Sequence, residues 1–313
     1  MKTAFLFPGQ GSQYVGMGKE FFDSFPEARE TFETADQVLG SALSELCFSG
    51  PKEELAKTVN TQPAVLVTSV ACYRVLSGFG FFPAAVAGHS LGEYSALVAS
   101  GAFRFADAVR LVRERGQSMQ EAVPLGSGGM LAVLGLDLAT AKRVCAQVSS
   151  SGVLEIANFN CPGQIVLAGH VGALENAVKL ARAQGAKKCV PLAVSGPFHS
   201  SLMRNAAERL AVVLSETEIF NPKIPIVSNV SADYLRWGDD VRTALLRQVY
   251  SPVRWEESVR RMLNDGVGCF VEVGPGSVLS GLVKRIAPRE TILLNVENME
   301  SLEKSLARLR EVG

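Results

Sequence analysis

The sequence AAVAGHSLGEYSALVAS, residues 84–100, contains the feature that decides the fold. Its first part, 84–87, is an apolar run between Pro83 and a glycine, which predicts a short buried strand. The GxSxG stretch Gly88-His89-Ser90-Leu91-Gly92 follows, and residues 91–100 then predict a helix. A strand-turn-helix of this kind exposes the serine and needs glycines where a Cβ would collide with nearby backbone. The stretch predicts a nucleophilic serine. The alternative is a glycine-rich loop with an incidental serine.

The chain around this stretch alternates between strand and helix patterns. A strand is expected at 3–7 and ends at a glycine-rich turn, 8–13. Helices are expected at 27–39, at 52–58, from just after Pro63 to about 76, and at 105–121. Strands and helices joined in this order by sharp turns are typical of a parallel α/β sheet.

The middle of the chain has a different order of elements. Strands are expected at 130–134, 154–158, 165–168 and 188–192, with helices at 138–148 and 173–184. This β-α-β-β-α-β order is the ferredoxin-like pattern. After it the α/β pattern returns, with helices at 202–214, 241–249, 255–263, 278–286 and 301–310 and strands at 224–227, 269–273 and 292–294. We therefore expect an α/β-hydrolase-like core with a parallel sheet, 1–125 and 195–313, and an inserted ferredoxin-like subdomain, 126–194.

Composition excludes several classes of protein. The 313 residues are 47% hydrophobic, which excludes disorder as the main state. Thirty-one basic residues balance 31 acidic ones, so no broad electrostatic attraction to nucleic acid or membrane is expected. The six cysteines lie far apart with no CxxC pair, which favours buried thiols over disulfides or metal ligands. With neither a secretory pattern nor a membrane-length apolar run, the sequence predicts a soluble cytoplasmic protein without metal.

A serine nucleophile needs a base, and the chain has three histidines. His89 is next to the serine on a tight turn and is interpreted as structural. His170 ends a strand, where helix entry or packing is the better interpretation. His199 lies in a Gly-Pro loop, 195–200, where the chain re-enters the core, and it is the preferred base. For the third group, Asp107 is better explained by its helix, and a backbone carbonyl could hold the imidazole instead. A Ser–His dyad is preferred.

The remaining catalytic requirements point to two loops and one helix. The amide of Leu91 follows the nucleophile and is a natural oxyanion donor, and the turn 8–13 offers a second. A phosphate-binding loop is the competing interpretation of that turn, but it lacks the P-loop ending. Arg115 lies near Arg110 and Arg113. It could bind a carboxylate in a cleft, although spacing alone favours a solvated helix face.

Taken together, these segments resemble the malonyl-CoA:acyl-carrier-protein transacylase family of type II fatty-acid synthesis, which is related to polyketide synthase acyltransferase domains. The resemblance covers essentially the whole chain. The matching segments are Phe7-Pro8-Gly9-Gln10-Gly11-Ser12-Gln13, Thr61-Gln62-Pro63-Ala64, Gly88-His89-Ser90-Leu91-Gly92-Glu93, Arg113-Glu114-Arg115-Gly116, Asn158-Phe159-Asn160-Cys161-Pro162-Gly163-Gln164, Gly196-Pro197-Phe198-His199-Ser200, Gln248-Val249-Tyr250-Ser251-Pro252-Val253-Arg254-Trp255 and Glu272-Val273-Gly274-Pro275-Gly276.

The resemblance implies a role for each matching residue. It places the nucleophile on Ser90 and the base on His199. It also reverses the spacing argument by making Arg115 the carboxylate-binding residue. The roles it implies at the remaining positions are the oxyanion amides of Gln10 and Leu91, the main-chain carbonyl of Gln248 as the group that holds the histidine, and Phe198 as the residue that leaves little room for a branched acyl group.

The implied activity is ping-pong transfer of malonyl from malonyl-CoA to the phosphopantetheine thiol of acyl carrier protein. It supplies fatty-acid synthesis and needs no cofactor. Candidate docking residues for an acidic carrier are Lys187, Lys188, Lys284 and Arg285, with ordinary solvated side chains as the alternative. A thioesterase or esterase, a trans-acting polyketide acyltransferase and a non-catalytic carrier-binding subunit remain as other interpretations.

Overall fold

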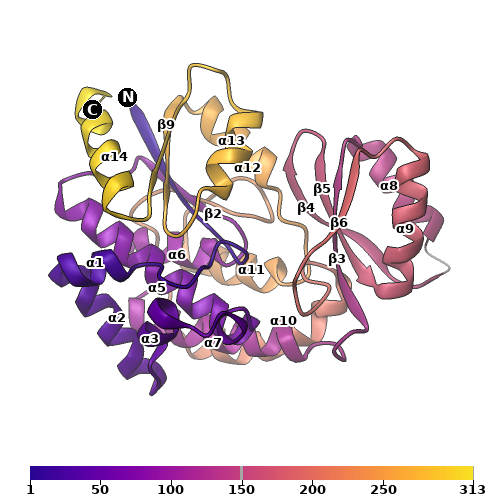
Figure 1. Cartoon of the computed structure of the whole chain (residues 1–313), viewed down its shortest axis with the longest axis horizontal. Helices are drawn as coiled ribbons and strands as arrows, with labels where there is room; N and C mark the ends of the chain where they lie inside the picture. The colour runs from indigo at the N-terminus through magenta and orange to yellow at the C-terminus, as the bar shows by residue number, and fades with distance from the viewer. Residues whose placement is uncertain (149–150, 313) are drawn as a thin grey trace.

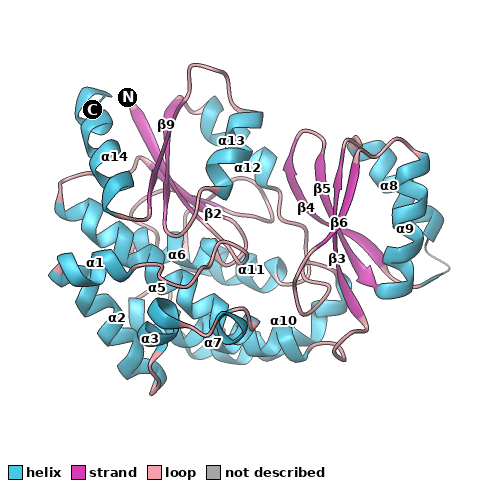
Figure 2. Ribbon diagram, viewed as in Figure 1, coloured by secondary structure: helices cyan, strands magenta, loops and turns pink. Residues whose placement is uncertain are grey.

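The computed structural model describes residues 1–148 and 151–312, and it contains two separate sheets (Figures 1 and 2). The larger sheet has the strand order β10-β9-β1-β2-β7-β8. Its pairs are parallel except that β8 runs antiparallel to β7. The strands are β1 Lys2–Phe7, β2 Ala85–Gly88, β7 Ile226–Val227, β8 Tyr234–Leu235, β9 Val267–Val273 and β10 Ile292–Val296. The expected parallel sheet is therefore present, with one short antiparallel strand added at its edge.

The inner parallel strands β9, β1, β2 and β7 are largely buried, whereas the edge strand β10 is mostly half-buried. Along β1, Phe5 and Phe7 belong to one apolar cluster, while Ala4 and Leu6 belong to another on the opposite face. This is the alternation that a strand imposes on its side chains. The helices around this sheet are α1 Lys19–Ser24, α2 Pro26–Leu39, α3 Leu43–Ser49, α4 Lys52–Leu55, α5 Thr58–Gly78, α6 Gly92–Ala99, α7 Phe105–Glu121, α10 Arg204–Glu216, α11 Gly238–Gln248, α12 Trp255–Asn264, α13 Val278–Ile286 and α14 Met299–Val312.

Two expected helix boundaries are wrong. The helix predicted at 52–58 ends at Leu55, because Thr58 already belongs to the next helix. The helix predicted to begin after Pro63 begins at Thr58, and the proline lies inside it. A proline removes one backbone donor and is usually excluded from a helix interior. Here the first turn has other support, because the Thr61 hydroxyl donates to the Leu55 carbonyl at 2.5 Å and α5 is buried against its neighbours. The short elements α1, α3 and β8 were not predicted.

The smaller sheet has the strand order β4-β5-β3-β6, and all its pairs are antiparallel. Its elements are β3 Gly128–Leu134, α8 Leu138–Val148, β4 Leu154–Cys161, β5 Gln164–His170, α9 Val171–Ala183 and β6 Lys188–Pro191. Helices α8 and α9 cover the outer face (Figure 1). On β3, Leu131 and Val133 pack under these helices, while Met130 and Ala132 join the core of the larger part.

The two sheets are joined through main chain as well as through side chains. The edge strand β4 pairs with Val253 of the segment that leads into α12. The Val253 N–H donates to Ala157 O at 2.8 Å, and Phe159 N–H donates to Val253 O at 2.9 Å. Among the described helices, none combines the length and the apolar character needed to cross a membrane.

Candidate active site

The nucleophile elbow is built by β2 and α6. Ser90 has φ 53°, in the left-handed region, which is costly for a residue with a Cβ. The flanking glycines make the turn possible. A Cβ on Gly88 would come within 1.9 Å of Gly92 C, and one on Gly92 would come within 2.0 Å of Phe7 O. The elbow therefore packs closely against the carboxyl end of β1, and no residue with a Cβ fits at position 88 or 92 without a shift of the main chain.

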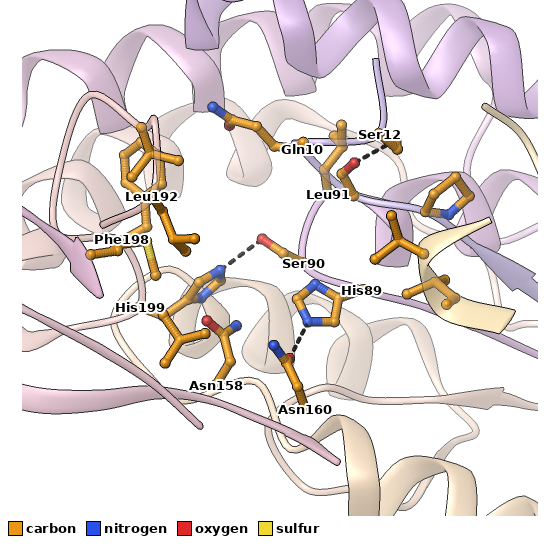
Figure 3. Close-up of a pocket in the computed structure, with 18 of the residues that line it drawn as sticks. Gln10, Ser12, His89, Ser90, Leu91, Asn158, Asn160, Leu192, Phe198 and His199 are labelled. Atoms are coloured by element: carbon orange, nitrogen blue, oxygen red, sulfur yellow. Dashed lines mark hydrogen bonds between the residues drawn. The ribbon is translucent and has the colours of Figure 1, made fainter. Parts of the chain in front are cut away.

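Ser90 and His199 form a hydrogen-bonded pair (Figure 3). Ser90 Oγ lies 2.7 Å from His199 Nε2, and His199 Nδ1 lies 2.8 Å from the main-chain carbonyl of Gln248. A carbonyl oxygen only accepts, so Nδ1 carries the proton and Nε2 is free to accept the serine proton. His199 itself has φ 59°, so both members of the pair are held in left-handed backbone.

The environment of His199 keeps its imidazole neutral. Burial lowers its pKa to about 3, and the positive charge of Arg115 adds to this effect. At neutral pH the ring is therefore a base rather than a cation. His89 is half-buried, and its Nε2 lies 2.9 Å from Asn160 Oδ1, away from the serine hydroxyl (Figure 3). His170 precedes α9, and its Nδ1 accepts the Val153 N–H at 3.1 Å.

The two expected oxyanion donors lie on the same side of Ser90 (Figure 3). Leu91 precedes the first residue of α6, where amide groups have no helical carbonyl to bond. Gln10 lies in the turn after β1, and its side chain points away from the serine and donates from Nε2 to Thr58 Oγ1 at 3.1 Å. The turn is fixed from within, since Ser12 Oγ donates to Gly9 O at 2.7 Å.

Arg115 is buried, with only 1% of its surface exposed, so the solvated face favoured by spacing is wrong for this residue. Its Nη1 donates to Gln62 Oε1 at 2.7 Å, and its Nη2 donates to Gln248 Oε1 at 2.9 Å and to Ser90 Oγ at 3.2 Å. Its guanidinium also lies over the Tyr94 ring, 5.2 Å from the centroid.

The other two arginines of this helix behave differently. Arg110 is exposed and pairs with Asp107 at 3.3 Å, which agrees with the helix role preferred for that aspartate. Arg113 donates to Asn60 Oδ1 at 2.7 Å. Among these three arginines, the buried one, Arg115, is the one that donates to Ser90 Oγ.

The pocket above Ser90 has walls from both sheets. The larger part contributes the turn after β1, the elbow and α13, while the smaller sheet contributes side chains from β3, β4 and β5. Phe198 is buried beside His199 in this wall (Figure 3). The lining residues from the smaller part are Met130, Asn158, Asn160, Gln164, Val166, Leu192 and Val194. A cleft is thus present between the two sheets, and Ser90 lies at it.

The candidate docking residues are exposed and are not among the residues that line the pocket. Lys188 is the first residue of β6 and Lys187 immediately precedes it, while Lys284 and Arg285 lie in the last turn of α13. Arg285 is also occupied within the chain, because it donates to Gln164 Oε1 at 2.8 Å and to Pro162 O at 2.7 Å. It therefore ties α13 to the turn between β4 and β5.

Sequence reasoning missed a set of buried polar side chains around the site. Gln62 and the side chain of Gln248 hold the guanidinium of Arg115, while Glu93 and Asn229 lie beneath the elbow. The available signal was the position of polar residues inside apolar stretches, as with Gln62 in the apolar helix α5. In the part of the chain that the structure describes, no cluster of three or more His, Cys, Asp or Glu side chains is placed to hold a metal ion.

A serine on a strained elbow, paired with a neutral histidine, is the arrangement of enzymes that carry an acyl group on serine. Fold and site assign the chain to that class. Residues 4–303 match the acyl transferase domain family. The chain is 49% identical to a malonyl CoA-acyl carrier protein transacylase of Bacillus subtilis over 311 residues, covering 99% of this chain and 98% of the relative.

Solved structures agree with this match. The fold superimposes on a malonyl CoA-acyl carrier protein transacylase from Clostridium perfringens with TM-score 0.96 and 44% identity, covering 100% of this chain and 98% of the other. A malonyl-transacylase in complex with its type II PKS acyl-carrier protein gives TM-score 0.95 and 46% identity, covering 98% and 100%. The chain belongs to the malonyl CoA-acyl carrier protein transacylase family, and it is an acyltransferase.

Proposed function

We propose that this enzyme transfers the malonyl group from malonyl-CoA to the phosphopantetheine thiol of an acyl carrier protein, through a malonyl ester on Ser90. The observation that carries the proposal is Arg115, whose guanidinium is buried and lies 3.2 Å from Ser90 Oγ. A buried cation beside the nucleophile suits an acyl group that ends in a carboxylate, because it supplies the opposite charge in a medium of low dielectric.

In the first half-reaction, Ser90 Oγ attacks the thioester carbonyl while its proton moves to His199 Nε2, 2.7 Å away. The amides of Gln10 and Leu91 stabilise the oxyanion, each contributing about 3 kcal/mol to lowering the barrier. The tetrahedral intermediate then collapses, the carbon–sulfur bond breaks, and the CoA thiolate takes the proton from His199. The Gln248 carbonyl keeps the imidazole in the required tautomer throughout.

In the second half-reaction the carrier thiol gives its proton to His199 and attacks the ester carbonyl. The carbon–oxygen bond to Ser90 breaks, and Ser90 recovers its proton from the imidazolium. Between the two steps Arg115 holds the acyl carboxylate. Phe198, buried in the pocket wall, leaves little room for a branch at the α-carbon. The chemistry needs no cofactor, and we place the enzyme in fatty-acid synthesis in the cytoplasm.

We also propose that the carrier protein docks near the pocket mouth. Lys187, Lys188, Lys284 and Arg285 are exposed cations from the two parts of the molecule that form the pocket walls. An acidic carrier would be steered by such a surface. The internal hydrogen bonds of Arg285 make it the least available of the four.

We also propose that the chain is divided into a core and an inserted subdomain. We assign 1–125 and 195–313 to an α/β-hydrolase-like core and 126–194 to a ferredoxin-like subdomain, ranges that include residues 149–150 and 313, outside those described. The β-α-β-β-α-β order and the antiparallel strand order β4-β5-β3-β6 support the second assignment.

The test is covalent labelling with malonyl-CoA, followed by peptide mapping. We expect one malonyl group on Ser90 and none in Ser90→Ala. Arg115→Ala should lose most malonyl transfer while keeping acetyl transfer. An unlabelled wild-type protein would exclude the ester mechanism, and equal losses for both acyl groups would exclude the carboxylate role of Arg115. Release of free malonate without carrier acylation would instead identify a thioesterase.

A further inference from the structure

Glu93 is a buried carboxylate to which the mechanism above gives no task. It lies in the first turn of α6, three residues after the nucleophile, and has 0% of its surface exposed. It is not one of the residues that line the pocket, so it does not meet the acyl group. Burying a carboxylate this deeply costs folding free energy unless hydrogen bonds or an opposite charge compensate it. Its contacts show which groups depend on it.

The first contact is with the side chain of Gln248. Its Nε2 donates to Glu93 Oε2 at 2.6 Å and to Ser90 O at 2.9 Å, while its Oε1 accepts from Arg115 Nη2 at 2.9 Å. The orientation of the amide is unambiguous, because a guanidinium only donates and a carboxylate accepts. The amide therefore lies between a buried cation and a buried carboxylate and links Glu93 to Arg115.

The second contact is with Asn229. Its N–H donates to Glu93 Oε2 at 3.3 Å. Its side chain accepts the Ser90 N–H at 2.7 Å and donates to Gly88 O at 2.6 Å. The main chain of Ser90 is thus held at its N–H by Asn229 and at its carbonyl by Gln248, and both of these residues meet at one oxygen of Glu93.

We propose that Glu93 is a positioning residue for acyl transfer. Acting through Gln248 and Asn229, it keeps Ser90 in its left-handed conformation and keeps the guanidinium of Arg115 directed at the acyl group. The role is that of a hydrogen-bond acceptor at a single oxygen, Oε2. The proposal rests on the proposed function, since it assigns Arg115 to the acyl carboxylate.

The state of Oε1, the second carboxyl oxygen of Glu93, shows why the positioning role does not require a negative charge on Glu93. Glu93 Oε1 has no hydrogen-bond partner among the described residues. Burial raises the pKa of Glu93 to about 7, although the hydrogen bonds from Gln248 and Asn229, the positive charge of Arg115 and the nearby Ser228 hydroxyl oppose the shift. A proton on Oε1 leaves Oε2 free to accept. A glutamine at this position offers the same acceptor and places its amide nitrogen where Oε1 lies.

The experiment compares Glu93→Ala with Glu93→Gln and with a control for helix stability, Leu97→Ala. Leu97 is buried in the same helix and has no part in the hydrogen-bond set. Steady-state malonyl and acetyl transfer are measured for each folded variant. We expect Glu93→Ala to lower kcat for malonyl transfer by about 30-fold or more, because misplacement of a reacting group by about 1 Å costs about 100-fold. Its malonyl-to-acetyl ratio should also fall.

Glu93→Gln should stay within about 3-fold of wild type and keep the ratio, and Leu97→Ala should keep the ratio whatever stability it loses. Adding Glu93→Ala to Gln248→Ala should lower kcat by less than Glu93→Ala does alone, because the route through Gln248 is already lost and only the route through Asn229 remains. The proposal is overturned if Glu93→Ala behaves like Leu97→Ala, if Glu93→Gln is as impaired as Glu93→Ala, or if the two alanine effects simply add. Labelling of Ser90 in wild type keeps these outcomes separate from a failure of the proposed function.

Discussion

The two sheets contribute to the pocket in different ways. The parallel sheet presents the carboxyl ends of its strands, so its share is a set of turns with main-chain amides, a strained serine and the buried polar groups beneath it. The antiparallel sheet presents one face, so its share is a row of side chains such as Met130 and Val166. Main-chain geometry has few alternatives, whereas side chains on a face can be exchanged. Substitutions at the elbow should therefore damage the reaction, and substitutions on the smaller sheet should adjust it.

A pair of histidine variants gives the largest contrast. His199→Ala should lower the rate of Ser90 acylation by about 10⁴-fold, because the serine loses the base that removes its proton. His170→Ala, on the smaller sheet, should leave that rate within about 3-fold, since the His170 ring accepts the main-chain N–H of Val153 and does not line the pocket. Rapid-quench measurement of the acyl-enzyme checks both. An equal loss in His170→Ala would show that the smaller sheet shares in the chemistry.

A pair of glycine variants compares how strongly the elbow and the smaller sheet each affect the free energy of unfolding. Gly92→Ala should lower the free energy of unfolding by about 3 kcal/mol or more, because the new Cβ would meet Phe7 O at 2.0 Å. Gly129→Ala in β3 should change it by less than about 1 kcal/mol, since its nearest neighbour is Leu174 Cδ1 at 3.5 Å. Urea unfolding monitored by circular dichroism measures both. A mild effect at Gly92 would mean that the elbow can relax.

The buried carboxyl of Glu93 predicts a pH dependence on the parallel-sheet side. Its pKa is raised to about 7 from the model-peptide value of 4.5, so the folded state binds its proton more tightly than the unfolded state. Between these two values a rise in pH removes stability, by up to about 3 kcal/mol in total. In the Glu93→Gln variant, the glutamine at position 93 has no carboxyl proton and does not titrate in this pH range. The free energy of unfolding of wild type minus that of the variant should therefore fall as pH rises from about 4.5 to 7. A difference that does not change with pH would contradict the raised pKa.

The smallest expected effect belongs to the face of the smaller sheet. Val166 is buried and lines the pocket. Val166→Ala should keep the malonyl transfer rate within about 10-fold while improving the use of a branched acyl-CoA by about 10-fold, because two methyl groups are worth that much discrimination. A competition assay with malonyl-CoA and methylmalonyl-CoA measures the change. A loss as large as that of His199→Ala would abolish the contrast between the two sheets.

The elbow was predictable from the sequence because its signals are local. Strand, glycines, serine and helix lie within 17 residues, and the fold places them as expected. The burial of Arg115 was not predictable from spacing, because helical periodicity says which residues share a side but not what packs against that side. Its partners Gln62 and Gln248 lie 53 and 133 residues away in the chain. The resemblance to a known family supplied what the spacing could not.

The remaining differences have similar physical causes. The helix α5 continues through Pro63 because tertiary contacts and the Thr61 hydroxyl outweigh a local breaking signal. The polar set formed by Glu93, Asn229 and Gln248 joins residues that are widely separated in sequence. Such sets are recognised only when the chain is folded, since each member alone is an ordinary polar residue.

The pairing of β4 with Val253 has a consequence for motion. Two main-chain hydrogen bonds, of 2.8 and 2.9 Å, extend the edge of the smaller sheet into the segment before α12. A hinge between the two parts would have to break them, and Arg285 adds a second attachment at the turn between β4 and β5. We therefore expect the two walls of the pocket to keep their spacing when a substrate binds. The fit of an acyl group between these walls then adds to the charge selection by Arg115. Slow hydrogen exchange at the amides of Phe159 and Val253 should accompany the fixed spacing.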